Sequence, residues 1–165
     1  MSMIDQLLYI KHFREQQAET AMQKSRMVLA QAHRIEDDAQ QELTRFVEQA
    51  KKDELAWYQA LCDRIVKVRD IEGVQTDVAI LRAEEAQRAQ ELAQAQQARE
   101  QAQSSFNAAT QVLRDASTAR NKFEELAMRH HEALVKEAER KEDLELEELA
   151  GVVREREAMT THADA

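Results

Sequence analysis

This sequence almost lacks the residues that interrupt helices. Its 165 residues include no proline and only two glycines, Gly73 and Gly151. Proline and glycine mark turns and end helices, so their scarcity leaves the chain few places to reverse. Because sheets and α/β folds need many turns, we expect an all-α protein built from long helices. The same scarcity excludes the Gly-rich loops that bind phosphate.

The one cluster of helix-breaking residues surrounds Gly73. This glycine can adopt the left-handed conformation that ends a helix, and Thr76 can cap the helix that follows. A left-handed Gly73 also predicts that Gly73→Ala weakens the fold. We therefore predict a single hairpin over residues 1–150 with a first arm over about 4–69, a turn over about 70–76 and a second arm over about 77–150, followed by a loose C-terminal tail over 151–165.

Apolar residues recur at alternating steps of three and four along both arms, over positions 8–57 and 81–134. A period of 3.5 residues sustained over many heptads is typical of a coiled coil. Folding back at Gly73 pairs residues whose numbers sum to 145, which places Leu43 opposite Ala102. The expected fold class is therefore all-α, with two long helices forming an antiparallel coiled-coil hairpin.

Charge and hydropathy exclude several classes of partner. The chain carries 32 acidic and 23 basic residues, a net charge of -9, so nucleic acid is not an expected partner. No apolar run approaches the roughly 18 residues that a membrane-spanning helix needs, so we expect no membrane insertion. The one cysteine, Cys62, cannot form an internal disulfide, which is typical of a reducing cytoplasm.

The sequence offers no constellation for chemistry. His130 and His131 are adjacent, so on a helix they point about 100° apart and cannot share a metal ion. Paired acids such as Glu84 and Glu85 would lie on a thin rod, which has no dry pocket to shift their pKa values. We therefore expect a protein that is not an enzyme, with no catalytic residue, cofactor or metal.

Two features suggest interaction surfaces, and each has an alternative. Residues 137–149 carry seven acids against Arg140 and Lys141, which indicates either a solvated helix end or a docking end for a basic surface. Trp57 and Tyr58 form the one adjacent aromatic pair. They either pack in the seam or anchor a partner near the bend, since Trp and Tyr are favoured at binding hot spots.

Three segments give the chain a family resemblance: residues 8–15 (LYIKHFRE), 120–126 (RNKFEEL) and 142–149 (EDLELEEL). With the overall length, the single central break and the acidic end, they resemble the YscO/FliJ family of central-stalk proteins in bacterial type III secretion. The injectisome (YscO) branch is the more similar of the two.

The resemblance implies a non-enzymatic, cytoplasmic stalk at the cytoplasmic face of a type III secretion apparatus used in virulence. Family members form a coiled coil similar to the stalk of rotary ATP synthases. They bind the hexameric export ATPase and promote its assembly and turnover, and they contact the export-gate cytoplasmic domain and secretion chaperones. The ATPase-facing end would then comprise Lys11, Arg14, Glu15, Glu142, Asp143, Glu145, Glu147 and Glu148, and the tip would comprise Trp57, Tyr58 and Leu61.

Two other interpretations stay open at this point. The chain can be a dimeric structural rod without an ATPase partner, or a helical holdase or interaction protein. A stalk hairpin is expected to be monomeric on its own, at 19.0 kDa, whereas a rod of paired chains would have twice that mass.

Overall fold

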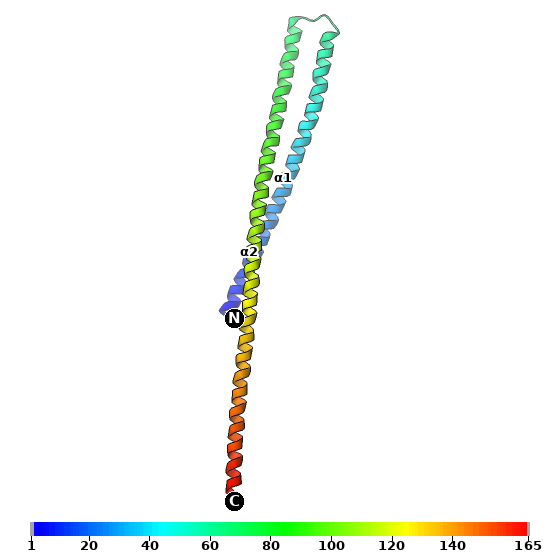
Figure 1. The fold of residues 1–165 in the computed structure, drawn as a ribbon. Helices are drawn as coiled ribbons and strands as arrows, with labels where there is room; N and C mark the ends of the chain where they lie inside the picture. Colours follow the sequence, from blue (N-terminus) through cyan, green and yellow to red (C-terminus); the bar gives the residue numbers. More distant parts are fainter. Residues whose placement is uncertain (1, 165) are drawn as a thin grey trace. The chain divides into compact units, whose positions relative to one another are not determined.

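Two long α-helices account for nearly all of residues 2–164, the part of the chain that the computed structural model describes. Helix α1 spans Met3–Cys62 and helix α2 spans Val68–Ala163, with residues 63–67 between them. The helices form an antiparallel hairpin (Figure 1), and no strand occurs among the described residues. The predicted fold class is confirmed.

The two helices contribute to two compact units. One unit comprises residues up to Gln16 together with those from Arg114 onward, and the other comprises Gln17–Leu113. Each unit therefore contains a stretch of α1 and a stretch of α2, and each has its own part of the apolar seam.

The predicted seam is confirmed over 8–57 and 81–127, but not at its last two positions, because His130 and Leu134 are exposed. Every position in the 8–57 series is buried or half-buried, and so is every position of the 81–134 series as far as Ala127. The residues that are buried most fully are small, except for one leucine: Ala18, Ala32, Ala50, Leu92, Ala95 and Ala102. Small side chains let two helices approach closely, but they bury little apolar area, so the hairpin has a thin core.

Charged residues also occupy the seam, where they are paired. In the Gln17–Leu113 unit, the Arg99 guanidinium forms an ion pair with Glu36, and both side chains are less than a third exposed. The Arg88 guanidinium lies 4.0 Å from the centroid of the Phe46 ring and 3.5 Å from a carboxylate oxygen of Glu42. Each of these cations would be costly to bury without such a partner.

These contacts fix the register of the hairpin, and they show that the predicted register is wrong. Arg99 with Glu36 gives a sum of 135, and Arg88 with Phe46 gives 134, instead of the expected 145. At a sum of 145, Glu36 would lie opposite Ala109 and would lose its counterion. The apolar period alone fits several registers, whereas the paired charges fit this one.

The different register also moves the turn away from its predicted position. The helices are joined by residues 63–67, and the predicted turn at 70–76 lies inside α2. Gly73 has no positive φ, and the Thr76 hydroxyl donates to the Glu72 carbonyl at 2.9 Å, one turn back in the same helix. Helix α2 begins instead with a cap in which the Lys67 N–H donates to an Asp70 carboxylate oxygen at 3.1 Å.

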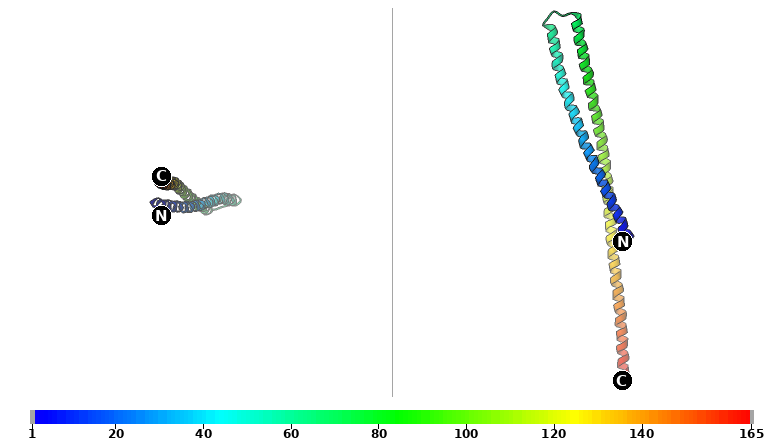
Figure 2. Two further views of the ribbon diagram at one scale, coloured as in Figure 1. Left: turned by 90° about the horizontal axis from the view of Figure 1, so that it is seen from below. Right: turned by 180° about the vertical axis from the view of Figure 1, so that it is seen from behind.

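The predicted loose tail is also corrected, because α2 continues through Gly151 to Ala163. The right-hand view in Figure 2 agrees with Figure 1 that α2 runs on past the N-terminal end of α1. From Met128 to Asp164 every described residue is exposed. Beyond Glu132, which still lies beside the start of α1, the described part of α2 therefore has no helix packed against it within its unit.

Candidate interaction surfaces

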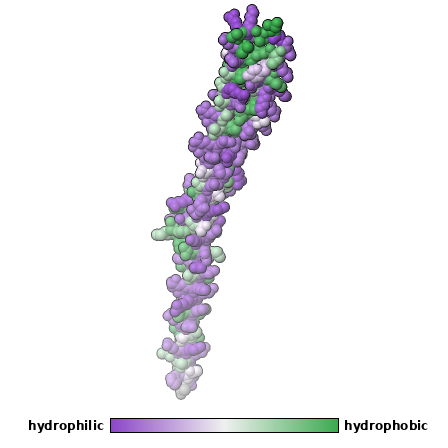
Figure 3. All heavy atoms as spheres, turned by 45° about the horizontal axis from the view of Figure 1, so that its top comes forward, coloured by the Kyte–Doolittle hydropathy of each residue, from purple (hydrophilic) through white to green (hydrophobic). Residues whose placement is uncertain are grey.

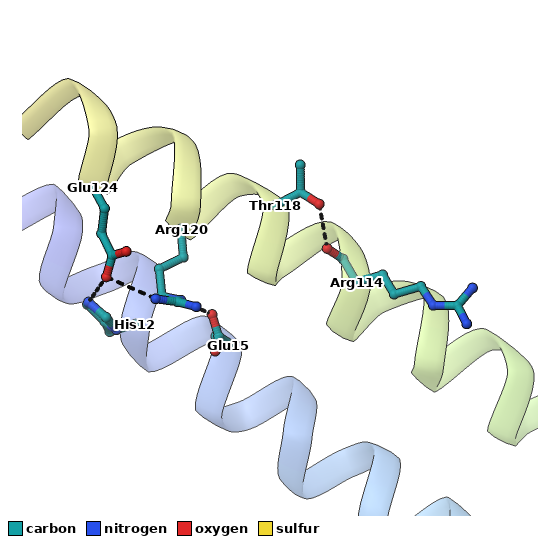
Figure 4. Close-up of polar contacts among 6 residues, drawn as sticks. All are labelled: His12, Glu15, Arg114, Thr118, Arg120 and Glu124. Carbon is teal, nitrogen blue, oxygen red and sulfur yellow. Dashed lines mark hydrogen bonds and ion pairs between the residues drawn. The ribbon is translucent and has the colours of Figure 1, made fainter.

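The chain-terminal unit contains a polar cluster at the place where the sequence predicted an ATPase-facing end. Figure 4 shows it between α1 and α2. The Arg120 guanidinium pairs with Glu15 across the helices, and it also donates to Glu124 at 2.9 Å. The imidazole Nε2 of His12 lies 3.3 Å from the same Glu124 carboxylate. Four polar side chains are thus tied to one another between the helices.

The electrostatics of this cluster follow from its geometry. The hydrogen bond to Glu15 is the largest cause that raises the pKa of Arg120, and Glu124 adds to it, while desolvation acts in the opposite direction. Because Arg120 stays charged at any physiological pH, the cluster holds a permanent cation between two carboxylates. The cluster is therefore suited to join the two helices.

The predicted residues of α1 in this unit divide into two kinds. Glu15 forms an ion pair with Arg120, and the Lys11 ammonium lies 5.0 Å from the centroid of the Phe123 ring. Both are therefore engaged within the hairpin. Arg14 is exposed, so it is the member of this group that is free to meet a partner.

The acidic residues predicted at this end all lie on the unpaired part of α2. Glu142, Asp143, Glu145, Glu147 and Glu148 are exposed and helical. Three leucines lie among these acids and are also exposed: the exposed fractions of Leu144, Leu146 and Leu149 are 53%, 64% and 62%. The segment over 137–149 is thus an acidic helix with an apolar component that nothing in its unit covers.

A shallow groove lies beside the α1 end of the same unit. It is lined by the apolar side chains of Leu8, Ala127 and Met128, by the carboxylates of Asp5, Glu124 and Glu132, and by His131. The groove was not predicted from the sequence, because it depends on where α1 begins on the surface of α2. Its lining combines apolar and acidic side chains, as the acidic segment does.

The bend end carries the second predicted site. Trp57 is half-buried at a seam position, Leu61 is half-buried, and Tyr58 is exposed. The seam interpretation therefore fits Trp57, while Tyr58 is available to a partner. Figure 3 shows apolar surface gathered at this end.

The tip predicted from the sequence did not include three apolar residues at the bend end, because the turn was expected elsewhere. Ile65 is fully exposed in the loop, and Val68 and Ile71 are exposed at the start of α2. The sequence does contain a signal for this surface: Ile65, Val66 and Val68 lie close together, and the residues around them do not alternate between apolar and polar. β-Branched residues are poor helix formers, and exposed apolar ones together indicate a contact surface.

Neither a metal-binding group nor a membrane-spanning helix is found among the described residues. No group of His, Cys, Asp and Glu side chains within residues 2–164 could hold a metal ion. Neither α1 nor α2, as described, is apolar enough over a sufficient length to cross a membrane. Cys62, the free cysteine, is exposed next to the loop.

Comparison with known proteins decides the family. Residues 4–152 match the model of a family described as type III secretion protein YscO. The chain belongs to the YscO family. A solved YscO from Vibrio parahaemolyticus, a crystal structure at 2.8 Å, is 23% identical and superposes with a TM-score of 0.80, covering 88% of this chain and 92% of that chain. No protein in the curated set matches the chain.

Membership of the YscO family confirms the resemblance predicted from the sequence and makes this chain a type III secretion protein. The solved YscO shares its fold. The match extends to residue 152 and so includes the acidic segment.

Proposed function

We propose that this YscO-family protein is a non-enzymatic, cytoplasmic stalk that binds the hexameric export ATPase of a type III secretion apparatus and promotes its assembly and turnover. The single observation that supports this most is the acidic segment over 137–149, which is helical and exposed on a stretch of α2 that has no partner helix. A helix of this length gains most of its stability from packing, so an unpaired one is suited to gain a partner.

The chemistry of the acidic segment defines the partner surface. Glu142, Asp143, Glu145, Glu147 and Glu148 favour a surface rich in Lys and Arg, while the leucines between them favour apolar contacts with the same surface. Arg14 and the groove around Leu8 and Met128 would extend that contact toward the end of α1. The protein acts here through binding energy alone, which can favour one assembled state of the ATPase.

The bend end is proposed to contact the export gate and secretion chaperones. Tyr58, Ile65, Val68 and Ile71 present apolar surface there, and Figure 3 shows hydrophobic surface gathered at this end. Exposed apolar residues gathered at one place are typical of a protein–protein contact.

The test is the turnover of a cognate export ATPase titrated with this protein, with the assembly of the ATPase followed by light scattering in the same samples. The wild-type chain is expected to raise turnover together with hexamer formation. Replacing Glu142, Glu145, Glu147 and Glu148 by Gln should remove most of the stimulation, since it removes four charges from the docking helix.

The matched control removes the same charge elsewhere. Glu19→Gln, Asp37→Asn, Asp38→Asn and Glu48→Gln change four exposed acids of α1. This control is expected to stimulate like the wild type. Equal loss in both variants would assign the effect to net charge, and absence of stimulation and binding by the wild type would favour the structural-rod alternative.

A further inference from the structure

A shallow groove follows one side of the seam in the Gln17–Leu113 unit. Val28 and Ile35 of α1 form one wall and are 57% and 51% exposed. Ala95, Ala98 and Ala102 of α2 form the other. Because the alanines are small and both sets repeat at helical spacing, the groove has the form that accepts the ridge of a third helix.

Cations lie next to this groove. No charged residue is described in its own lining. The two hollows that share Val28 with it are lined by two cations, Lys24 and Arg34, and none of the residues described in their linings is acidic. The chain as a whole carries a net charge of -9. An acidic helix with an apolar stripe is therefore the occupant that complements the groove.

The chain itself carries such a helix. Leu146, Leu149 and Val153 are exposed and lie at positions i, i+3 and i+7, which is the spacing of Ala95, Ala98 and Ala102 in the wall of the groove. On a helix such positions share one face. Glu142 and Glu145 lie beside that apolar stripe on the same helix. The apolar stripe and its flanking acids thus match the apolar walls and the flanking cations.

We propose that the acidic segment of one copy docks in the α1/α2 groove of a second copy and forms a local three-helix bundle there. The contact is head to tail, because it joins two different surfaces of the same chain. Such contacts leave one groove and one segment free, so they extend beyond a dimer as concentration rises unless they close into a ring. The proposal goes beyond the stalk function, since it gives the docking segment a second partner that would compete with the ATPase.

The experiment is sedimentation equilibrium on the full chain in the presence of a reductant, because exposed Cys62 could otherwise join copies covalently. Between about 10 and 500 µM the average mass should rise above the 19.0 kDa of one chain, as expected for a weak interface. Added salt should lower the average mass, because exposed opposite charges are screened.

Charge reversal identifies the two surfaces. Lys24→Glu with Arg34→Glu reverses the groove, and Glu142→Lys with Glu145→Lys reverses the segment. Each double variant alone should bind itself about tenfold more weakly than the wild type. An equimolar mixture should associate again, since each variant then meets a surface of opposite charge.

The controls separate this result from misfolding and from net charge. Lys51→Glu with Lys52→Glu makes the same charge change as the groove variant, but on exposed residues outside the groove. This control should associate like the wild type. Ala98→Gln narrows the groove without a charge and should also weaken association. Far-UV circular dichroism verifies that each variant keeps its helices.

Three outcomes would overturn the proposal: a mass that stays at 19.0 kDa over the whole range, a mixture that stays monomeric, or association that the groove variants leave unchanged. None of these measurements includes the ATPase. Failure of self-association is therefore distinguishable from failure of the proposed function.

Discussion

At the scale of single residues, Gly73 shows how context decides what a glycine does. It lies inside α2, and a Cβ added there would meet no atom within 4 Å. Since glycine in a helix costs about 0.5–1 kcal/mol relative to alanine, Gly73→Ala should raise the free energy of unfolding by about that amount. Urea titration measures it. A decrease would instead support the left-handed turn expected from the sequence.

The ion pair between Glu15 and Arg120 is expected to stabilise the chain-terminal unit more than a surface pair does. Their side chains are 22% and 24% exposed. A double-mutant cycle with Glu15→Gln and Arg120→Gln should therefore give a favourable coupling that is larger than the coupling of an exposed pair.

The control for that cycle is the pair of Glu125 and Arg129 on α2. Their side chains are 64% and 70% exposed, and they lie one turn apart on the same helix. Its coupling should stay below about 0.5 kcal/mol. Equal couplings in the two cycles would mean that the pair between the helices stabilises the protein no more than an exposed pair does.

The start of α1 carries the pH dependence that the structure predicts. The Ser2 hydroxyl and backbone N–H both donate to an Asp5 carboxylate oxygen, and these hydrogen bonds lower the pKa of Asp5. A lowered pKa in the folded state means that the cap stabilises the helix above the ordinary aspartate pKa of about 3.9 and is lost as pH falls below it.

Amide hydrogen exchange in the first turn of α1 tests this cap. At pH 7 the wild type should be better protected than Asp5→Asn, and the difference should shrink as pH falls below about 4. Ser2→Ala should lose the same protection. A difference that persists unchanged at low pH would contradict the assignment.

At the scale of the helices, the register is the property to test. In a Cys62→Ser background, Ala32→Cys with Ala102→Cys places two thiols in buried seam positions whose numbers sum to 134, close to the sums given by Arg88 with Phe46 and Arg99 with Glu36. This pair should form a disulfide quickly under mild oxidation, as observed by gel mobility.

The alternative register supplies the matched comparison. Ala32→Cys with Leu113→Cys has a sum of 145 and should remain reduced under the same conditions. Fast oxidation of this second pair, with no oxidation of the first, would instead support a turn at Gly73.

The helices also show which features can be read from a sequence. The seam positions were predictable, because a 3.5-residue period is a property of each helix by itself. The register depends on which charged seam residue of one helix meets which of the other, such as Glu36 with Arg99. Several registers bury the same apolar positions, so this choice was not predictable from the period.

At the scale of the whole molecule, the paired helices and the unpaired part of α2 should differ in stability. Ending the chain at Lys136 removes a stretch that is exposed throughout, so the free energy of unfolding should change by less than about 1 kcal/mol. The same truncation should remove stimulation of the export ATPase. Chemical denaturation and the turnover assay measure the two effects separately, and a large loss of stability would show that the stretch packs on the hairpin.

The fold class, the seam, the acidic segment and the resemblance to the YscO family could all be predicted from the sequence. These follow from local properties, namely the scarcity of proline and glycine, the apolar period and the order of charges along one helix. The place of the turn, the pairing of Glu15 with Arg120 and the groove beside Ala98 became visible only in the folded chain. Each of those requires one helix to be set against the other, and that setting depends on contacts between residues far apart in the sequence.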